Sequence, residues 1–317
     1  MKFVDFAAAG GTEVNQINGG NDGLRFYLLG DVHIEKEHSF ETIFLPRPVQ
    51  CLLGYLLIYR DRFHSREALA NRLWDDEDIG RSRACLSTAL WRLRRVIEHN
   101  RRRGVYLTQT AQNDIKFNTT SHYSLDVEIL ESKISRIVAT PLDKLTESEV
   151  SETEDAFSLY RGDLLEGHYG DWVIGERERL RALYLDSLAV AMEYRASRSD
   201  YTRALAHGHK ALQIEPLRED IHRTVMHVYA MSGRIAQALR QFNVCRDLLR
   251  KELGIAPMRA TLALHEEIAQ QVAIPRNPTT PQPLRPTRGI SQPPAASEMS
   301  NGRRTSKPGE ARQGTSR

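Results

Sequence analysis

The alternation of apolar and polar residues divides the chain into two blocks with different periods. The first block, residues 24–123, opens with three short apolar and aromatic stretches at 24–29, 32–34 and 42–45. Stretches of this kind between glycine and polar turn residues are typical of strands, so we expect a small antiparallel sheet. In the second block, from about 125 to 272, the apolar spacing is helical throughout.

Three helices are expected after these strands. Pro48 suits the first position of the first helix, and the side chain of Ser65 can cap the second. The third, expected over about 81–99, has a continuous apolar stripe along one face. The stripe consists of Leu86, Leu90, Leu93 and Ile97.

The third helix is also the most basic part of the chain. The net charge of the whole chain is only +3, yet residues 81–103 hold eight arginines and one acid, Glu98. At about 100° per residue, the side of the helix away from the stripe gathers hydroxyl, arginine and tryptophan side chains. Guanidinium groups neutralise phosphates and pair with guanine edges, so this face is predicted to bind the major groove of DNA. The candidate contacts are Arg83, Ser87, Thr88, Trp91, Arg92, Arg94 and Arg95.

Within this face the side chains suggest different tasks. Ser87 and Thr88 are short enough to lie near base edges, whereas the arginines grip phosphates or reach bases. Trp91 either stacks on the DNA or covers the protein's own surface. A merely solvated basic face is the alternative interpretation of the whole helix.

A β-hairpin is expected directly after the basic helix. Its two strands are predicted at 105–109 and 114–118, with a polar tip between them. Arginines 101–103 extend the positive charge toward this hairpin, which favours the DNA interpretation. Candidate contacts on the hairpin are Thr108, Thr110 and Gln112.

The second block contains an internal repeat of 34 residues, the period of tetratricopeptide helix pairs. Small residues at matching positions let two antiparallel helices pack closely, and the next pair stacks on the exposed face. The matching pairs include Ala204 and Ala238, Ala211 and Cys245, Met192 and Met226, and Ser199 and Gly233. Core positions are expected at Trp172, Leu180, Leu183, Tyr184 and Leu188.

These motifs together resemble a known family of bacterial regulators. The sequence WRLRR at 91–95 is similar to the recognition-helix signature of OmpR-type winged helix-turn-helix domains, and residues 24–118 resemble that domain. The second block resembles the bacterial transcriptional activation domain. Its hallmarks are YRGDLL at 160–165, DWV at 171–173, ERERL at 176–180 and ELGIAP at 252–257. In this order they resemble the Streptomyces antibiotic regulatory protein type of pathway-specific transcriptional activator.

The resemblance implies a mode of action. Such activators bind direct repeats in promoter DNA as side-by-side copies and contact RNA polymerase, at a sigma or alpha subunit, through the turn between the second and third helices. Here that turn is 74–80, with the acids Asp75, Asp76, Glu77 and Asp78. The alternative is a solubilising turn that complements the N-terminus of the third helix. The hairpin tip departs from the family, since the chain has Asn113 and Asp114 where a Gly-Tyr pair is usual.

The expected fold class is mainly α with a small β part, a winged helix followed by a tetratricopeptide-like domain. We expect a disordered N-terminus at 1–22, a DNA-binding domain at 23–123 and an activation domain at 124–272, each domain with its own core. The Pro- and Arg-rich tail at 273–317 is expected to be disordered.

Enzymatic and membrane functions find no support in the sequence. The histidine spacings give no metal-ligand pattern, and neither a phosphate-binding loop nor a nucleophile elbow occurs, so we expect no cofactor, no metal and no catalysis. The three cysteines lie far apart and predict neither a disulfide framework nor a zinc site, which fits a reducing cytoplasm. Asp5 interrupts the apolar residues at the start of the chain, so we expect no signal peptide there. The competing function is a protein-interaction adaptor whose winged helix no longer binds DNA.

Overall fold

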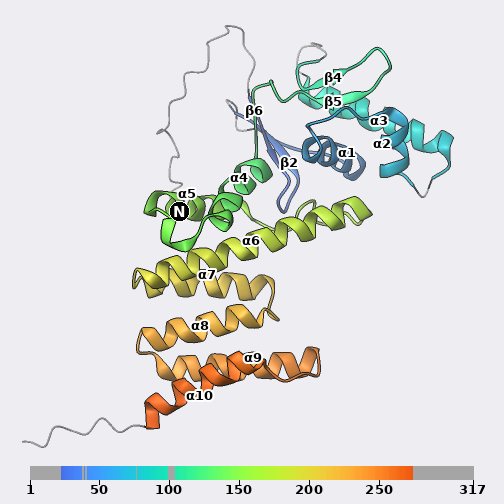
Figure 1. The fold of residues 1–317 in the computed structure, drawn as a ribbon. Coiled ribbons are helices and arrows are strands. Elements are labelled where there is room, and N and C mark those ends of the chain that lie inside the picture. The colour runs from blue at the N-terminus through green and yellow to red at the C-terminus, as the bar shows by residue number, and fades with distance from the viewer. Residues whose placement is uncertain (1–22, 38, 40, 76, 99–103, 274–317) are drawn as a thin grey trace, which may run out of the picture. The chain divides into compact units, whose positions relative to one another are not determined.

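A computed structural model of the chain describes residues 23–37, 39, 41–75, 77–98 and 104–273. The expected disordered ends, 1–22 and the tail beyond 273, lie outside the described residues, as do arginines 101–103. The described part is mainly helical with a small β part, so the expected fold class is confirmed. Figure 1 shows the strands with α1, α2 and α3, and the helices α6 to α10 as successive layers.

The first sheet has four strands in the order β3-β2-β1-β6. Strands β1 (Leu24–Tyr27), β2 (His33–Lys36) and β3 (Thr42–Phe44) form the expected antiparallel part, with Phe26 opposite Ile34. Strand β6 (Tyr123–Leu125) adds a parallel edge beside β1 that the apolar pattern did not predict. A three-residue strand is too short to show a period of two, so the three expected strands are antiparallel as predicted but the parallel fourth strand was missed.

The three expected helices of the first block are present. Helix α1 (Arg47–Ile58) follows Pro46, so Pro48 is its second residue rather than its first. Helix α2 (Arg66–Leu73) is capped by Ser65, whose Oγ accepts a hydrogen bond from the Ala68 N–H. Helix α3 (Ile79–Ile97) begins two residues earlier than expected because Asp78 caps it.

The expected hairpin consists of β4 (Leu107–Gln109) and β5 (Ile115–Phe117) in a sheet of their own. The tip is closed by two backbone hydrogen bonds, Thr110 N to Asp114 O and Asn113 N to Thr110 O, each 3.0 Å long. Asn113 closes the turn with a φ of 66°, a conformation that asparagine tolerates better than most residues.

The second block is helical from Asp126 onward. Helices α6 to α10 pack in sequence order, and the long α6 also packs against α4. Two short 3₁₀ helices, η2 (Leu142–Lys144) and η3 (Phe157–Leu159), connect the first helices. The α-helices are α4 (Asp126–Ala139), α5 (Glu147–Ala156), α6 (Asp171–Ser197), α7 (Tyr201–Ile214), α8 (Glu219–Met231), α9 (Ile235–Glu252) and α10 (Arg259–Ala273).

The structure explains the 34-residue repeat. Ala204 and Ala238 lie at equivalent, fully buried positions of α7 and α9, where a larger side chain would separate the helices. Ser199 and Gly233 both follow a helix end with a positive φ, 62° and 74°, and so turn the chain in the same way. The expected core residues are buried, except that Leu183 is only partly covered.

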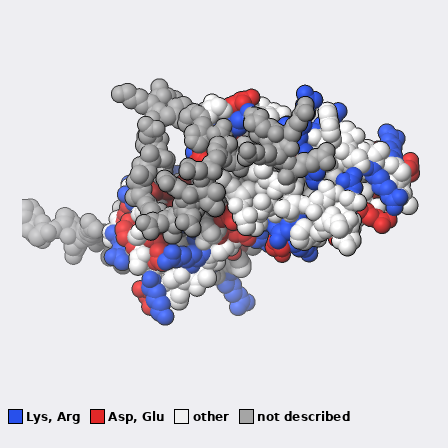
Figure 2. Space-filling model, turned by 90° about the horizontal axis from the view of Figure 1, so that it is seen from above, with Lys and Arg blue, Asp and Glu red and all other residues white. Residues whose placement is uncertain are grey.

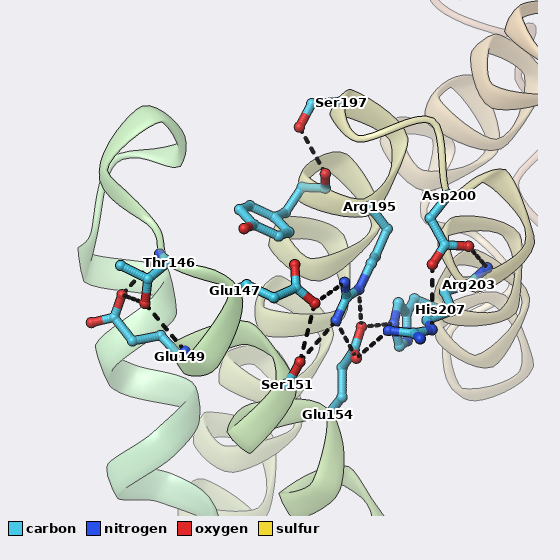
Figure 3. Close-up of polar contacts among 11 residues, drawn as sticks. Thr146, Glu147, Glu149, Ser151, Glu154, Arg195, Ser197, Asp200, Arg203 and His207 are labelled. Carbon is cyan, nitrogen blue, oxygen red and sulfur yellow. Dashed lines mark hydrogen bonds and ion pairs between the residues drawn. The ribbon is translucent and has the colours of Figure 1, made fainter.

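A buried ionic cluster joins α5, α6 and α7 (Figure 3). Arg195 donates to both oxygens of Glu154 at 2.7 Å and also pairs with Glu147. His207 Nε2 lies 2.8 Å from Glu154 Oε1, the oxygen that also accepts from Arg195 Nε. Burial by itself would raise the pKa of Glu154, but the hydrogen bonds from His207 and Arg195 outweigh it and lower the pKa to about 2.

One continuous core runs through both blocks, and the helical block has two further apolar clusters of its own. The segment after β1 pairs with the YRGDLL motif: Leu165 N donates to Leu28 O at 2.9 Å and Gly30 N donates to Asp163 O at 3.0 Å. A Cβ on Gly162 would lie 3.0 Å from the Cα of Gly30, so this close approach requires glycine. The motif therefore fixes the activation block to the sheet of the first block.

A second junction contact comes from the start of α4. Asp126 is buried and its Oδ2 accepts hydrogen bonds of 2.9 Å from the N–H groups of Leu28 and Leu29. Burial raises the pKa of Asp126, and the backbone donors offset only part of this effect, leaving it at about 6.

Candidate nucleic-acid interface

Helix α3 packs with its apolar stripe toward the core, as the sequence predicted. Leu86, Leu90, Leu93 and Ile97 are all buried. Asp78 accepts a hydrogen bond from the Arg81 N–H, and the hydroxyl of Ser82 donates to carbonyls of the preceding turn. The helix is thus fixed along one face and at its N-terminus, which leaves the opposite face open to solvent.

The side chains predicted to contact DNA lie on that open face. Ser87, Thr88, Trp91, Arg92 and Arg95 are exposed, whereas Arg94 is half-buried. Trp91 is 59% exposed, so it covers little of the protein's own surface. Figure 2 shows basic side chains at the right-hand end of the molecule, the side where α2 and α3 lie in Figure 1, with a smaller acidic group beside them.

The arginines of α3 differ in their partners. Arg83 pairs with Glu67 of α2 at 3.2 Å, and the guanidinium of Arg95 lies over the Trp91 ring, 5.5 Å from its centroid. Within the described residues no hydrogen bond or ion pair engages Arg92. Among the described residues, Arg92 is therefore a cation of this face that has neither a polar partner nor a ring contact.

The two hydroxyl residues are already hydrogen-bonded to their own helix. Ser87 donates to Arg83 O at 2.8 Å and Thr88 donates to Ala84 O at 3.0 Å, so both would meet DNA mainly as acceptors. The Ser87 oxygen also accepts a bond of 2.8 Å from Arg66 of α2. Arg66 is thus brought to this face although it precedes Ser87 by 21 residues, and no sequence period could have found it.

The three predicted hairpin contacts are not equivalent. Gln112 is exposed at the tip. Thr110 uses its hydroxyl to accept from the Asp114 N–H, and the Thr108 hydroxyl donates to Lys116 O across the hairpin. Their side chains stabilise the hairpin itself, and Gln112 is the residue of the three best placed to reach a ligand.

Two further hairpin residues carry polar side chains next to the predicted contacts and were missed. The Lys116 ammonium lies 5.6 Å from the centroid of the exposed Phe63 ring, and Gln109 accepts a hydrogen bond from Arg94. Lys116 could have been found from sequence, since it alternates with the buried Ile115 and Phe117. The bond from Arg94 to Gln109 thus connects α3 to the hairpin, and Lys116, which lies opposite Thr108 in the register, adds a positive charge to the hairpin.

Two acids of the turn between α2 and α3 already have partners within the protein. Glu77 pairs with Arg81 at 3.1 Å and Asp78 caps α3, as the structural alternative for this turn requires. Asp75 is exposed, and Asp76 lies outside the described residues. Asp75 is therefore the described acid that is open to a partner.

Other kinds of site find no support among the described residues. No group of three or more His, Cys, Asp or Glu side chains there is placed to hold a metal ion. In the same part of the chain, no helix has both the length and the apolar character needed to cross a membrane.

Comparison with known proteins identifies the helical block. Residues 125–269 match the family model of the bacterial transcriptional activator domain. The chain carries a bacterial transcriptional activator domain. The predicted resemblance to the Streptomyces antibiotic regulatory protein type of transcription regulator is thereby confirmed.

Two curated relatives extend the similarity over both blocks. The regulatory protein AfsR of Streptomyces coelicolor is 26% identical over 253 residues, which cover 78% of this chain and 24% of the relative. AfsR of Streptomyces griseus is 23% identical over 250 residues, with the same coverage of both chains. The chain thus spans about a quarter of the length of these regulators.

A solved structure supports the fold. The structure titled Mycobacterium tuberculosis EmbR in complex with low affinity phosphopeptide superimposes with a TM-score of 0.65 at 20% identity. The match covers 79% of this chain and 66% of that one. The arrangement of a winged helix followed by stacked helices is therefore shared with that protein.

Proposed function

We propose that the protein is a sequence-specific DNA-binding activator of transcription that binds direct repeats in promoters. The observation that carries this proposal is the orientation of α3, whose apolar stripe is buried and whose arginine face is open. A helix held in this way can enter the major groove without losing its contacts to the core. Such a protein would act in the cytoplasm, where bacterial DNA lies.

In this proposal, the partners of each arginine within the protein decide whether it contacts a base edge or a phosphate. Arg92 is available for a base edge because no described side chain engages it. Arg83 and Arg95 keep local partners and are better suited to phosphates, which demand less exact placement. Arg66 and Lys116 add two positive charges to the same backbone contact.

We propose that the turn between α2 and α3 contacts RNA polymerase, with Asp75 as the leading residue. Its carboxylate is exposed, whereas Glu77 and Asp78 also serve α3. A basic patch on a sigma or alpha subunit would complement it. Replacing Asp75 by Asn should lower promoter-dependent transcription in vitro while DNA binding is unchanged, and equal losses of both would contradict this role.

Footprinting of the full chain on promoter DNA tests the proposed function. We expect protected direct repeats whose centres lie about one turn, 10 to 11 base pairs, apart, as tandem copies would give. We also expect affinity to fall steeply with salt because phosphate neutralisation releases counterions. A protein-interaction adaptor would give neither protection nor salt-dependent DNA binding, and that result would overturn the proposal.

A further inference from the structure

A ladder of three side chains connects α3 to the tip of the hairpin. Arg94 Nη2 donates to Gln109 Oε1 at 3.1 Å, and Gln109 Nε2 donates to Asn113 Oδ1 at 2.7 Å. The ladder begins on the flank of the open face of α3, crosses the end of β4 and finishes at the residue with the positive φ. It therefore spans the two elements that the proposed function places on DNA.

The hairpin needs such a support. Its strands have three residues each and form a separate two-stranded sheet, which depends on contacts with the rest of the domain: Leu107, Ile115 and Phe117 are buried in the core, whereas residues 111–113 at the tip are exposed. On the β5 side, Ile115 exchanges two backbone hydrogen bonds of 2.8 Å with His64. On the β4 side, the Leu107 N–H donates to Glu98 Oε1 at 3.4 Å at the start of the strand, and the side-chain bond from Arg94 to Gln109 adds a connection at its end, next to the tip.

The ladder also separates Arg94 from Arg92, two residues further toward the N-terminus of α3. Arg94 is half-buried, one of its amino groups is engaged by Gln109, and its Nε is buried without a hydrogen-bond partner in the described structure. Arg92 is exposed and unengaged. A guanidinium held in this way is poorly placed to search for a base but well placed to orient the amide of Gln109.

We propose that Arg94, Gln109 and Asn113 form a positioning ladder that fixes the hairpin to α3, so that helix and hairpin read DNA as one rigid unit. Arg94 is in this view a positioning residue rather than a base-reading one. The ladder sets where the exposed Gln112 lies relative to Arg92. This inference rests on the proposed function for its effect on DNA, but the ladder itself is testable in the free protein.

Amide hydrogen exchange of the free, full-length protein tests the ladder without DNA. In Arg94→Ala and Gln109→Ala we expect faster exchange at Thr110 and Asn113, whose amides close the tip. Arg92→Ala is the matched control, since it removes an arginine from the same helix outside the ladder, and its exchange at the tip should equal the wild type. Unchanged exchange in both ladder variants would overturn the ladder.

A double-mutant cycle on DNA tests what the ladder does. The probe is a duplex that the wild-type chain selects from a random-sequence library. If Arg94 acts through Gln109, the double variant should bind at least about threefold more tightly than independent effects of the two single variants predict. Independent effects would show instead that Arg94 contacts DNA by itself.

Footprints of the same duplex distinguish a positioning role from general damage. In Gln109→Ala we expect hydroxyl-radical protection by the hairpin to shrink while methylation protection of guanine N7 under α3 persists. Gln237→Ala, which removes an exposed glutamine from α9, should leave both footprints unchanged. Equal loss of both protections in Gln109→Ala would overturn the positioning role, whereas failure of the wild type to select any duplex would overturn the proposed function.

Discussion

Arg92 on α3 and Arg195 on α6 show two opposite uses of one residue type. The side chain of Arg195 is 4% exposed and is held by Glu147, Glu154 and Ser151 (Figure 3). Arg92 is exposed and meets no described partner. The guanidinium is the same in both, so its surroundings decide whether it stabilises the fold or is left for a ligand.

The largest effect is expected from removing the buried arginine. Arg195→Ala leaves Glu154 inside the helical block without its main cation, and breaking a buried pair in this way costs about 3–5 kcal/mol of the free energy of unfolding. Chemical denaturation of the full chain measures it. Arg203→Ala is the control, since Arg203 lies 3.8 Å from the same carboxylate but is 56% exposed, and its loss should cost under about 1 kcal/mol. Equal losses in the free energy of unfolding for both variants would show that burial of Arg195 does not make it more important for stability than the exposed Arg203.

The opposite pattern is expected for the exposed arginine. Arg92→Ala should cost on the order of 1–3 kcal/mol in binding to the selected duplex, because a base contact is lost. The free energy of unfolding should change by less than about 0.5 kcal/mol, since the side chain has no described partner. Gel-shift titration at moderate salt gives the first quantity. Arg240→Ala, which removes an exposed arginine of α9, should leave binding unchanged, and unchanged binding in Arg92→Ala as well would refute the base contact.

The sequence predicted those features that depend on regular spacings or on contacts between residues close along the chain. The stripe of α3 and the equivalence of Ala204 and Ala238 follow from spacings of 3 to 4 and of 34 residues, so the helices could be placed without coordinates. Ser65 could be recognised as a cap because capping is local. The exposed face of α3, with Arg92 and Trp91, followed directly from the buried one.

Contacts between distant segments could not be predicted. Asp126 accepts a hydrogen bond from the backbone of Leu28, 98 residues away, and no pattern in either segment indicates that the two pair. The bond from Arg94 to Gln109 was missed for a related reason, since it depends on how the hairpin folds back on α3. Arg94 therefore was grouped with Arg92 from sequence, although the structure gives it a different environment.

Arg177 is intermediate between the buried Arg195 and the exposed Arg92, so we expect its removal to cause an intermediate loss in the free energy of unfolding. It is half-buried and donates to the carbonyl oxygens of Leu164, Leu165 and His168 at 2.9–3.0 Å. Arg177→Ala should cost about 1–2 kcal/mol of the free energy of unfolding, because water can replace part of these bonds. Amide exchange should increase at Leu165, whose N–H pairs with Leu28 at the junction. An unaffected junction would show that Arg177 does not support the YRGDLL motif.

The smallest effect on stability is expected at Asp126, a buried carboxyl that accepts hydrogen bonds from backbone N–H groups. Glu154 has cations beside it and a pKa of about 2, whereas the pKa of Asp126 is raised by burial to about 6. Because the folded protein binds the Asp126 proton more tightly than the unfolded chain, this group adds stability at low pH. The contribution is fully present below about pH 4 and is lost as the pH rises through 6. Between pH 7 and pH 5 the gain from this one carboxyl is about 1 kcal/mol.

Carbon-13 NMR titration of the Asp126 carboxyl is the decisive measurement, since the histidines also titrate in this range. Burial lowers the pKa of His168 and of His222, so acidification destabilises the fold through them and opposes the Asp126 effect. The net pH dependence of stability alone would therefore mislead. A carboxyl pKa near 6 would show that the three N–H groups of Leu28, Leu29 and Val127 do not replace a cation for a buried carboxylate. A pKa below 4 would show that they do, and would weaken the contrast between Asp126 and Glu154.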